Sequence, residues 1–592
     1  MSAAATTRWA RAFVDELARC GVEEVVVAPG SRSTPLVLAL AADGRFRMRV
    51  HLDERSAAFF ALGVGKATGR PGAVVTTSGT ATANLYPAVV EAAQSETPLL
   101  VLTADRPPRL RDADANQAID QVRMYGGYAK AFFETAQPEL NGPALRHLRG
   151  LACRAVAAAM ASPAGPVHVN LPFDKPLEPV ADTPDVPVFD AGQRLAAHGR
   201  PDGRPYVDVQ PARATADGAT LDALIARLRE ARSPVVVAGP SARAADVGPA
   251  AVAFAGALGA PLLADPLSGG RFAVGAPDVG VAGYDLFLRD RAVREALAPD
   301  LVVRVGAGAT SASLQGWLAA HDGVDHVVID GDGRWKDHAA LATRYVRADA
   351  AHTLRALAER LEAADGPGEP DGNGVWTARW RAVDRAARDA LGRGPSGGHE
   401  GAATAAAAAA VPDGGTLFVS SSMPVRDLDA FSVPDGRAVR VHGNRGASGI
   451  DGIVSTAFGA AAGPTVCVLG DLALFHDQNG LLFARDGDRP VVFVLIDNDG
   501  GGIFHMLPVA DHEPHFTRFF ATPHGLDFAH TAALHGLPLE DRPAVEVEEA
   551  VRAALDAGGT RIVRVRTDRV QGQAERRTVA AAVAANVRAA LE

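Results

Sequence analysis

Residues 491–502 read Val-Val-Phe-Val-Leu-Ile-Asp-Asn-Asp-Gly-Gly-Gly, an apolar run that passes directly into polar residues and glycines. A continuous apolar run of this length predicts a strand buried on both faces, as in a parallel sheet covered by helices. The run Thr465–Leu469, followed by Gly470 and Asp471, has the same pattern. Two such strands bring their polar ends to one edge of an α/β sheet, where these folds bind ligands.

The residues after these two strands offer oxygen ligands for a hard cation. Mg²⁺ prefers a carboxylate, an amide oxygen and a backbone carbonyl, with phosphate oxygens completing its octahedron. Asp471, Asn498 and the carbonyl of Gly500 supply these three donor types. A plain turn is the alternative interpretation of the segment after the second strand, because Asn, Asp and Gly favour turns. The paired Gly-Asp after the other apolar run favours a split metal and diphosphate site.

Length and composition restrict the class of protein. The 592 residues, 47% hydrophobic and 22% charged, suffice for about three or four ordinary domains. A formal net charge of −10 argues against a nucleic-acid binder. The three cysteines, Cys20, Cys153 and Cys467, support neither a disulfide framework nor a multi-cysteine metal site, and they favour a reducing cytoplasm. We expect no signal peptide and no membrane insertion.

The order of apolar runs predicts the domain organisation. Short Val/Leu/Ile runs alternate with helical patterns in three blocks, which predicts an α/β protein with three doubly wound parallel-sheet domains. The predicted domains cover residues 1–181, 218–364 and 377–592. Polar segments rich in Pro, Asp and Gly predict linkers over residues 182–217 and 365–376.

Nine further runs are predicted as strands from their Val, Leu and Ile content. They are Glu23–Val27, Arg47–Leu52, Ala73–Thr77, Leu99–Thr103 and Val167–Asn170 in the first block, Pro234–Ala238, Leu301–Val305 and His326–Ile329 in the second, and Arg561–Arg566 in the third.

The segment Val25–Pro35 indicates an anion-binding loop. It reads as a strand, a tight turn and a helix start, so its free N–H groups and the charge of Arg32 are suited to a carboxylate. Helix capping by Ser31 or Ser33 is the alternative. Capping does not explain why an arginine lies between the two serines.

A second anion site is predicted after the strand Leu99–Thr103. There Arg106 is followed by two prolines and then, a few residues later, by Asn116 and Gln117. A guanidinium and two amides on a rigid loop are suited to a carboxylate.

Two strand-to-helix junctions in the first block carry further candidates. Glu54 lies in the first turn of a predicted helix, where the macrodipole favours a carboxylate, and an ordinary structural acid is the alternative. Ser78 and Gly79 belong to a run of small hydroxyl residues at another helix start. Such a junction allows close approach by a ring or a phosphate, although a well-capped helix would look the same.

The third block adds two arginines at predicted strand ends. Arg426 follows Ser422, and Arg445 precedes a glycine-rich loop. A single arginine is more often a solvated surface charge than a ligand. Together with Arg32 and Arg106, however, these two favour an anionic substrate with several carboxylates.

Two other patterns are set aside. Gly306-Ala307-Gly308 follows a predicted strand but lacks the third glycine of a dinucleotide fingerprint, so NAD binding is disfavoured. Five histidines lie in an irregular stretch without zinc-ligand spacing, which favours a lid or an ordinary surface. They are His505, His512, His515, His524 and His530.

Taken together, the motifs resemble those of thiamine diphosphate enzymes. Gly470-Asp471, followed 27 residues later by Asn498, resembles their cofactor motif, although Leu472 and Asp497 stand where the family usually has Gly and Asn. The three blocks resemble the pyrimidine-binding, central and pyrophosphate-binding domains of that family. Six segments resemble more closely its menaquinone-biosynthesis branch: Ala28–Pro35, Asp53–Arg55, Thr77–Pro87, Thr103–Pro108, Asn116–Gln117 and Asn444–Gly452.

The resemblance implies a cofactor and residues that hold it. Thiamine diphosphate would bind with Mg²⁺, or with Mn²⁺, on Asp471, Asn498 and Gly500. Glu54 would act as the acid–base residue on the aminopyrimidine ring, and Ile450 would support the bent cofactor. The other expected cofactor contacts are Ser78, Gly79 and Ser422.

The resemblance also implies a reaction. The enzyme would be a transferase that decarboxylates 2-oxoglutarate and adds the resulting succinyl unit to isochorismate. The expected substrate contacts are Ser31, Arg32, Arg106, Asn116, Gln117, Ser422, Arg426 and Arg445. Among these, Arg32, Arg106, Gln117, Arg426 and Arg445 are also expected to assist catalysis.

The resemblance further implies a homodimer or a dimer of dimers. Two alternatives stay open at this point. One is a thiamine diphosphate enzyme acting on another 2-oxo acid, and the other is a non-catalytic binding protein on the same scaffold.

Overall fold

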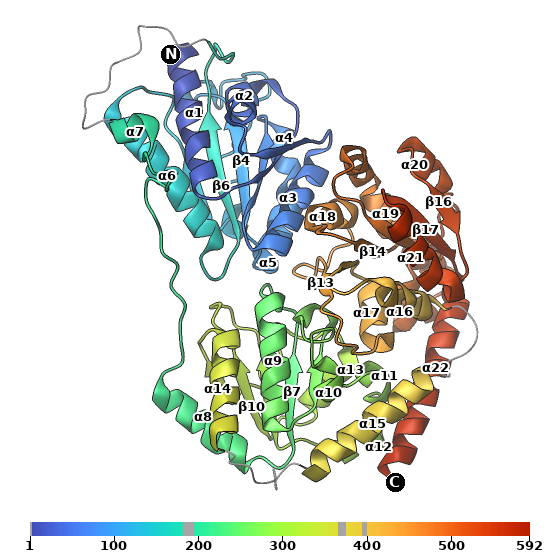
Figure 1. Cartoon of the computed structure of the whole chain (residues 1–592). Coiled ribbons are helices and arrows are strands. Elements are labelled where there is room, and N and C mark those ends of the chain that lie inside the picture. The colour runs from blue at the N-terminus through green and yellow to red at the C-terminus, as the bar shows by residue number, and fades with distance from the viewer. Residues whose placement is uncertain (1–2, 181–193, 365–373, 393–398) are drawn as a thin grey trace. The chain divides into compact units, whose positions relative to one another are not determined.

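A computed structural model describes residues 3–180, 194–364, 374–392 and 399–592 and contains three β-sheets with helices between the strands (Figure 1). Neighbouring strands of each sheet run parallel. The α/β class with three parallel sheets is therefore confirmed. The predicted linkers fall partly outside the described residues, and within the described part of them Arg194–His198 forms helix α7 and Gly374 begins helix α15.

The first sheet has six strands in the order β2-β1-β3-β4-β6-β5. Its strands are β1 (Glu24–Val27), β2 (Arg47–Val50), β3 (Gly72–Thr76), β4 (Leu99–Asp105), β5 (Ala131–Glu134) and β6 (Pro166–Pro172). Around it lie α1 (Ala3–Arg19), α2 (Thr34–Asp43), α3 (Glu54–Thr68), α4 (Thr80–Asn84), α5 (Tyr86–Gln94) and α6 (Gly142–Met160). Buried apolar residues of α1, α2 and α6 share one core with one face of this sheet, and α3 packs on β1 and β3.

The second sheet has five strands in the order β11-β10-β9-β7-β8. Its strands are β7 (Pro234–Ala238), β8 (Leu262–Ala264), β9 (Leu301–Val305), β10 (Asp325–Ile329) and β11 (Arg344–Val346). The helices of this region are α8 (Gly218–Glu230), α9 (Ala244–Leu258), α10 (Ala276–Val279), α11 (Tyr284–Phe287), α12 (Arg291–Ala296), α13 (Ala312–Ala319) and α14 (Ala350–Ala364).

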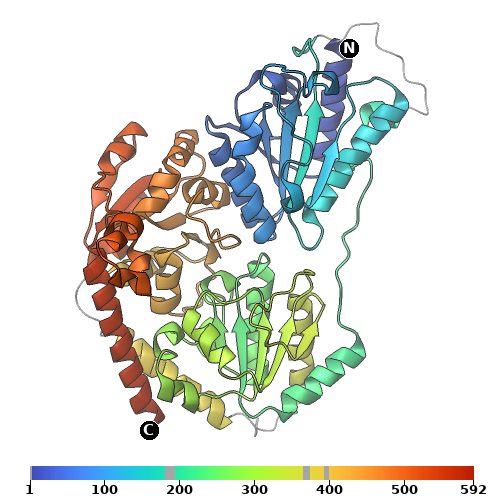
Figure 2. The same ribbon diagram turned by 180° about the vertical axis from the view of Figure 1, so that it is seen from behind.

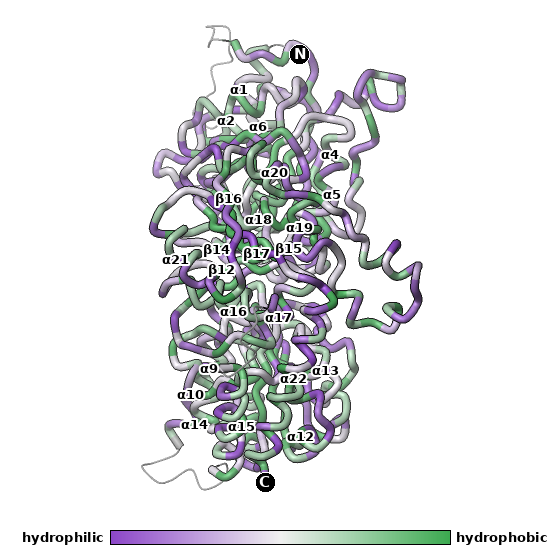
Figure 3. The backbone as a smooth tube through the Cα atoms, turned by 90° about the vertical axis from the view of Figure 1, so that its right-hand side faces the viewer, coloured by the Kyte–Doolittle hydropathy of each residue, from purple (hydrophilic) through white to green (hydrophobic). Residues whose placement is uncertain are grey.

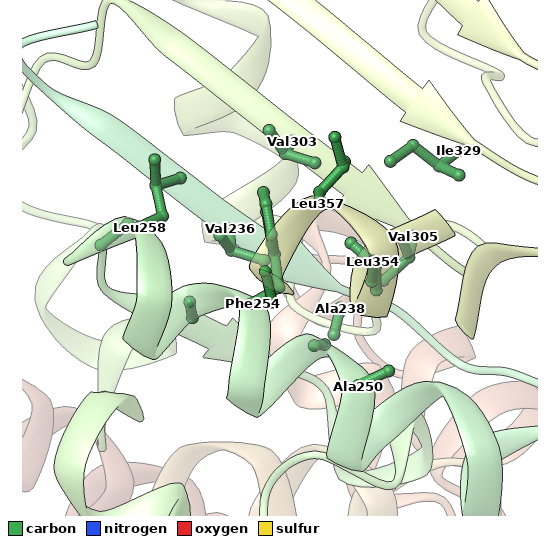
Figure 4. Close-up of a cluster of buried hydrophobic side chains, with 14 of the residues drawn as sticks. Val236, Ala238, Ala250, Phe254, Leu258, Val303, Val305, Ile329, Leu354 and Leu357 are labelled. Carbon is green, nitrogen blue, oxygen red and sulfur yellow. The ribbon is translucent and has the colours of Figure 1, made fainter. Parts of the chain in front are cut away.

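The core of the second sheet shows why this region forms a layered α/β structure. Phe254 of α9 and Leu354 and Leu357 of α14 pack with Val236 and Val303 of the strands (Figure 4). Successive strand residues face opposite sides of a sheet, so the apolar runs in β7 and β9 need a helix layer on each face. The second face is covered by another buried cluster, which includes Trp317 of α13.

The third sheet has six strands in the order β13-β12-β14-β15-β17-β16. Its strands are β12 (Thr416–Val419), β13 (Arg440–His442), β14 (Thr465–Gly470), β15 (Val492–Asp497), β16 (Leu539–Asp541) and β17 (Arg561–Arg566). The helices are α15 (Gly374–Gly392), α16 (Glu400–Ala410), α17 (Met423–Phe431), α18 (Ile453–Ala460), α19 (Asp471–His476), α20 (Ala529–Leu534), α21 (Val547–Ala557) and α22 (Arg569–Leu591).

Helices of the third block share a core with the second sheet. Trp376 and Trp380 of α15 and Val583 of α22 pack in one cluster with Val235 and Val302 of the second sheet. Helix α22, red at the C-terminus, lies beside α15 in both ribbon views (Figures 1 and 2). Many hydrophilic stretches lie in peripheral loops (Figure 3). No described helix is both long and apolar enough to cross a membrane.

Six strands fall outside the predicted ranges. Two of them are buried: β8, a short edge strand, and β12, an inner strand of the third sheet. The other four share a physical character. β5, β11, β13 and β16 are edge strands, and each has partly exposed residues. Edge strands need no continuous apolar run, so their sequences give a weak signal. The predicted ranges Pro234–Ala238, Leu301–Val305 and Arg561–Arg566 are each confirmed residue for residue.

Contacts divide the chain into two compact units. Unit 1 consists of Met1–Ala212 with Asn444–Ala461 and His476–Asp486, and unit 2 consists of the other residues. Helix α18 and the turn Gln478–Asp486 therefore belong with the first sheet, although they lie in the third block of the sequence. The reason is a close contact between α18 and α3.

Glycines allow the backbones of α3 and α18 to approach closely. A Cβ atom at Gly459 would lie 2.0 Å from the carbonyl oxygen of Phe60, and one at Gly63 would lie 2.2 Å from that of Thr456. At Gly452 a Cβ atom would lie 2.0 Å from the ring of Phe59. No larger residue fits these three positions without displacing backbone or ring atoms.

A buried carboxylate fixes the same two helices to the segment after α19. Asp477 accepts hydrogen bonds from the Ser56 hydroxyl of α3 at 2.9 Å and from the Ser455 backbone N–H of α18 at 2.7 Å. Burial raises the pKa of Asp477 to about 6, and its hydrogen bonds only partly offset this.

We predict that Gly459→Ala destabilises unit 1 by about 1–3 kcal/mol, because the added methyl group forces α18 away from α3. Denaturant unfolding of the purified protein measures the change. Gly150→Ala is the matched control, since Gly150 lies inside α6 and a Cβ added there would meet no atom within 4 Å. That substitution is expected to stabilise by about 0.5–1 kcal/mol, and equal destabilisation by both would contradict the contact.

Asp477→Asn is predicted to change how stability depends on pH. The folded carboxyl titrates near 6, above its ordinary value of 3.8, so it holds its proton more tightly than the unfolded chain does. Its contribution to stability is therefore greatest at low pH and is lost as pH rises through about 6. The difference in unfolding free energy between wild type and Asp477→Asn should shift against the wild type as pH rises from 3.8 to about 6, and should change little above that pH. A difference independent of pH would show that Asp477 titrates normally.

Candidate active site

The ends of β14 and β15 are joined through the carboxylate of Asp471. Its Oδ2 atom accepts the backbone N–H groups of Asn498 at 3.2 Å and Gly500 at 2.9 Å, and its Oδ1 atom accepts the N–H of Leu472 at 2.6 Å. Parallel pairing aligns Gly470 of β14 with Ile496 of β15, which brings the two polar ends together as the sequence predicted. The Asp471 residue is 2% exposed. Its carboxylate therefore fixes the conformation of the loop that carries the other two predicted ligands.

Asn498 presents one oxygen without a partner. Its Nδ2 atom donates to Oε1 of Glu400 at 2.7 Å, whereas its Oδ1 atom is buried and accepts no hydrogen bond from the described residues. A buried acceptor without a partner is costly, so such an atom calls for a specific ligand. Gly500 has a φ of 135°, which L side chains rarely adopt, and a Cβ there would lie 2.1 Å from the Ala521 carbonyl oxygen.

This donor set fits a hard cation. A buried carboxylate, an amide oxygen with no protein partner and a backbone carbonyl are oxygen ligands of the kinds that Mg²⁺ and Mn²⁺ accept. Asp497 and His524 add two further donors, and one ligand atom from each lies within 4.8 Å of the Asp471 carboxylate. Asp497 has a raised pKa because it is buried and lies near Asp471.

One histidine that the sequence analysis set aside belongs to this site. His524 lies 3.2 Å from Oδ2 of Asp471 through its Nε2 atom, and its backbone N–H donates to Asp499 at 2.9 Å. It therefore holds residues 520–526 against the metal loop. The irregular stretch is thus not simply a lid or a surface, because one of its histidines contacts a predicted metal ligand.

Ser422 and Arg426 lie at the start of α17, after β12. Ser422 has a φ of 71°, and its carbonyl oxygen accepts a hydrogen bond from Nη1 of Arg426 at 2.6 Å. Both residues are partly exposed and belong to unit 2. Their position at the carboxyl edge of the third sheet agrees with the prediction.

Glu54 and Ile450 belong to unit 1. Glu54 is the first residue of α3, and its Oε2 atom accepts a hydrogen bond from Nδ2 of Asn84 at 3.2 Å. Ile450 is partly buried and lies two residues before Gly452, which contacts Phe59 one turn further along α3. The α3–α18 contact therefore holds the Ile450 loop beside the helix that carries Glu54.

Arg32 and Arg106 form a pair of buried positive charges. Each is 8% exposed, and neither forms an ion pair with a carboxylate of the described residues. Burial lowers the pKa of both, and the charge of Arg106 lowers the pKa of Arg32 further. Nη1 of Arg32 donates to the Phe173 carbonyl at 2.9 Å, but its buried Nε has no partner among the described residues. The charges of Asp174 and Asp105 act in the opposite direction on the pKa of Arg32, but neither carboxylate forms an ion pair with Arg32. Two neighbouring guanidinium groups without a paired carboxylate are suited to bind an anion.

Ser33 does not act as the cap that was the alternative for this loop. Its hydroxyl donates to the Gly30 carbonyl at 2.9 Å, and neither helix start in this segment has a side-chain cap. Ser31 is exposed, and its carbonyl accepts the Thr34 hydroxyl at 2.7 Å. The capping interpretation was therefore wrong for both serines.

The second predicted anion loop is tied to Arg106. Its guanidinium donates to Oγ of Ser78 at 2.6 Å and to the carbonyl oxygen of Asn116 at 2.7 Å. Gln117, with a φ of 57°, donates through Nε2 to the Ser78 carbonyl at 2.9 Å. The structure thus brings Arg32, Arg106, Ser78 and the 116–117 loop into one region of unit 1.

Gln121 was not identified from the sequence. Its Oε1 atom accepts the N–H of Gly79 at 3.0 Å, and its Nε2 atom donates to Oδ1 of Asn170 at 3.0 Å. The backbone N–H of Gly79 and the polar atoms of Ser78 therefore form hydrogen bonds that hold the segment from Gln117 to Gln121 in place. Gln121 lies outside any recognisable pattern, so no local signal could have found it.

The Arg445 loop is fixed by a buried glutamate of the first block. Glu91 accepts the backbone N–H groups of Gly446 at 3.0 Å and Ala447 at 2.7 Å, and it pairs with Lys66 at 3.2 Å. Arg445 is partly exposed at the start of this loop. Sequence reasoning found Arg445 but not Glu91.

Comparisons with known proteins match the chain to three family models. Residues 7–124 match the N-terminal thiamine pyrophosphate binding domain of thiamine pyrophosphate enzymes, residues 200–419 match their middle domain, and residues 436–565 match their C-terminal thiamine pyrophosphate binding domain. A crystal structure of benzoylformate decarboxylase from Polynucleobacter necessarius superposes with a TM-score of 0.69 at 18% identity, covering 95% of this chain and 98% of that one. This second likeness concerns the fold alone.

Curated relatives extend over nearly the whole chain. Among the proteins similar to it are three named 2-succinyl-5-enolpyruvyl-6-hydroxy-3-cyclohexene-1-carboxylate synthase. The relative from Halobacterium salinarum is 48% identical over 97% of both chains. The relative from Halorubrum lacusprofundi is 43% identical, over 98% of this chain and 97% of its own. The relative from Chloroflexus aurantiacus is 42% identical, over 97% of this chain and 96% of its own.

Arg32→Met is predicted to abolish stabilisation by a dicarboxylate. Millimolar glutarate should raise the Tm of the wild type by about 2–4 °C, because an anion that binds only the folded state stabilises it. The variant should lose this shift, as measured by differential scanning calorimetry. Arg109→Met is the matched control, since Arg109 is exposed and paired with Asp174. An unchanged shift in Arg32→Met, or its loss in Arg109→Met, would contradict the anion site.

Proposed function

We propose a function on the premise that the chain belongs to the thiamine pyrophosphate enzymes and, within them, to the 2-succinyl-5-enolpyruvyl-6-hydroxy-3-cyclohexene-1-carboxylate synthases. The enzyme is a transferase of menaquinone biosynthesis. It decarboxylates 2-oxoglutarate and adds the remaining succinyl unit to isochorismate, releasing CO₂. The succinyl group and the ring carboxylate in the relatives' name agree with these two acids as substrates.

The buried Arg32–Arg106 pair is the observation that best supports this reaction. Both substrates are dianions, and two guanidinium groups with no carboxylate partner among the described residues are suited to bind them. Ser31 lies in the loop of Arg32, and Asn116 and Gln117 lie in the loop that Arg106 contacts. These residues would add hydroxyl and amide donors. Holding the two acids in place offsets their mutual repulsion and orients them for the addition.

The remaining substrate contacts are assigned to the third block. Arg426, Arg445 and Ser422 lie at the carboxyl edge of the third sheet or in the loop after β13. We assign them to the carboxylates that Arg32 and Arg106 do not bind. Arginine suits this role because its planar group binds a carboxylate through two parallel hydrogen bonds.

The cofactor is thiamine diphosphate, and Mg²⁺ is the proposed cation, with Mn²⁺ as a substitute. When bound, the cofactor supplies the electron sink that lets a 2-oxo acid lose CO₂ and transfer its remaining carbons. Asp471, Asn498 through Oδ1 and the Gly500 carbonyl would hold the cation against the diphosphate. The unpartnered Oδ1 atom of Asn498 supports this assignment.

Glu54 would hold a proton at the pyrimidine ring nitrogen of the cofactor. Its place in the first turn of α3 stabilises the carboxylate, and Asn84 orients one of its oxygens. Ile450 would pack against the cofactor, and Ser78 and Gly79 would border its pyrimidine ring. These roles follow from the positions that match the family motif.

The assembly and the domain roles are part of the same proposal. The first block, residues 1–181, would bind the pyrimidine, residues 218–364 would form the central domain, and residues 377–592 would bind the diphosphate. We propose a homodimer or a dimer of dimers. A cytoplasmic location stays a prediction from the cysteine content.

The test is an assay of both half-reactions. Protein with thiamine diphosphate and Mg²⁺ should consume 2-oxoglutarate and isochorismate together and give the decarboxylated adduct, detected by mass spectrometry. Glu54→Gln should lower turnover by about 10²- to 10⁴-fold, since a positioned acid–base group contributes that much. Glu23→Gln is the control, because Glu23 is exposed and pairs with Arg47.

Each other outcome has a definite meaning. Decarboxylation of 2-oxoglutarate while isochorismate survives would reject the proposed acceptor and favour another thiamine diphosphate enzyme acting on 2-oxo acids. No change in either compound, with thiamine diphosphate still bound, would favour a binding protein on this scaffold. Full activity in Glu54→Gln would reject the assigned role of Glu54.

A further inference from the structure

We propose that Glu400 is a positioning residue that orients the side-chain amide of Asn498 so that its Oδ1 atom points at the cation. The proposal rests on the proposed function, because it needs a cation at Asp471, Asn498 and Gly500. Glu400 is not among the predicted ligands. It would act on the cation only through Asn498.

The hydrogen bonds of Glu400 determine which way the amide lies. Oε1 of Glu400 accepts from Nδ2 of Asn498 at 2.7 Å and from the Thr567 hydroxyl at 3.0 Å. An amide turned the other way would place its oxygen against this carboxylate oxygen, and two acceptors repel each other. Glu400 therefore selects the orientation that leaves Oδ1 on the opposite side of the amide.

The other polar atoms of Asn498 are already occupied. Its backbone N–H donates to Asp471, and its carbonyl oxygen accepts from Nη1 of Arg569 at 3.2 Å. A Cβ atom at Gly502 would lie 2.8 Å from Nδ2 of Asn498, so the amide is also confined by the neighbouring backbone. With Nδ2 bound to Glu400, Oδ1 is the one polar atom of Asn498 without a partner among the described residues.

The burial of Glu400 argues against a purely stabilising role. The residue is 9% exposed, and burial raises the pKa of its carboxyl. A buried carboxylate carries a desolvation penalty, and well-packed apolar residues of similar size are often at least as stabilising. The hydrogen bond to a predicted metal ligand gives a functional reason for an acid at this position. Removing a residue that orients a metal ligand typically weakens the affinity for the metal.

Glu400 also joins two elements that are distant in sequence. It is the first residue of α16, after the cap His399, and Thr567 follows β17. Asn498 and Glu400 are 98 residues apart, so the contact depends on the packing of α16 beside the carboxyl ends of β15 and β17. A role as a structural link between these elements is the competing explanation, and the experiment must separate the two.

The experiment measures cation affinity directly. Mn²⁺ is titrated into the full chain at saturating thiamine diphosphate and followed by electron paramagnetic resonance. Glu400→Leu is expected to weaken Mn²⁺ binding by about 10- to 100-fold, the usual effect of removing a residue that orients a metal ligand. Glu400→Gln should keep an affinity close to that of the wild type, because its amide oxygen still accepts from Asn498 and Thr567.

Two controls separate orientation from stability. Asp384→Leu removes a carboxylate of α15 that accepts the Ala282 N–H at 2.8 Å and takes no part in the metal site. It should lower the Tm without changing Mn²⁺ affinity. Glu400→Met is a second variant at the same position, for use if the leucine variant does not fold. The unbranched side chain of Met follows the path of Glu. Glu400→Met should lose affinity as Glu400→Leu does.

The outcomes distinguish this proposal from the proposed function. Wild-type Mn²⁺ affinity in Glu400→Leu or Glu400→Met would overturn the positioning role of Glu400. A loss of Mn²⁺ affinity in Glu400→Gln as large as in Glu400→Leu would also overturn it, because the negative charge of Glu400 would then matter and not the orientation of the amide. If the wild type itself binds no Mn²⁺ with thiamine diphosphate, the assigned metal site fails first and Glu400 loses its role with it. Weakened binding in Leu and Met, rescue by Gln and no effect of Asp384→Leu would support the proposal.

Discussion

The candidate site depends on one buried carboxylate. By accepting the backbone N–H groups of Asn498 and Gly500, Asp471 connects the ends of two adjacent parallel strands and sets the path of the loop between β15 and the turns that follow. The loop then has little freedom, because Arg569 holds its carbonyl groups from the opposite side. Fixed in this way, the loop leaves Oδ1 of Asn498 without a partner among the described residues, while the Gly500 carbonyl accepts the Gly502 N–H at 3.0 Å. Under the proposed function, the fixed loop would limit the rearrangement that cation binding requires.

Unit 1 uses the same principle for anions. The fold buries Arg32 and Arg106 close together and gives them backbone and hydroxyl acceptors but no carboxylate among the described residues. Such an arrangement costs stability, because each buried charge is incompletely paired. Under the proposed function, an acidic substrate would offset that cost when it binds. The tight α3–α18 contact and the hydrogen bonds of Glu91 to the 446–447 loop hold Glu54, Ile450 and Arg445 within unit 1. The roles proposed for these residues in binding and proton transfer require such a fixed arrangement.

Much of this arrangement could be predicted from the sequence, for physical reasons. Strands buried on both faces require continuous apolar runs, so β14, β15 and β17 were predictable, and their ends located Asp471, Asn498 and Gly500. Edge strands such as β13 and β16 require no such run. Glu400 and Gln121 were missed, and His524 was set aside, because each acts through a single side chain that packing brings from elsewhere in the chain. The capping interpretation of Ser33 failed because its hydroxyl bonds to the preceding Gly30 carbonyl.

A crystal structure with thiamine diphosphate and Mg²⁺ would test the central claim most directly, because it shows which atoms hold the cation. The account predicts one cation per chain bound by a carboxylate oxygen of Asp471, Oδ1 of Asn498 and the Gly500 carbonyl, at about 2.0–2.1 Å, with Nδ2 of Asn498 still on Glu400. A cation held elsewhere, or an Asn498 amide that turns its nitrogen toward the diphosphate, would contradict it.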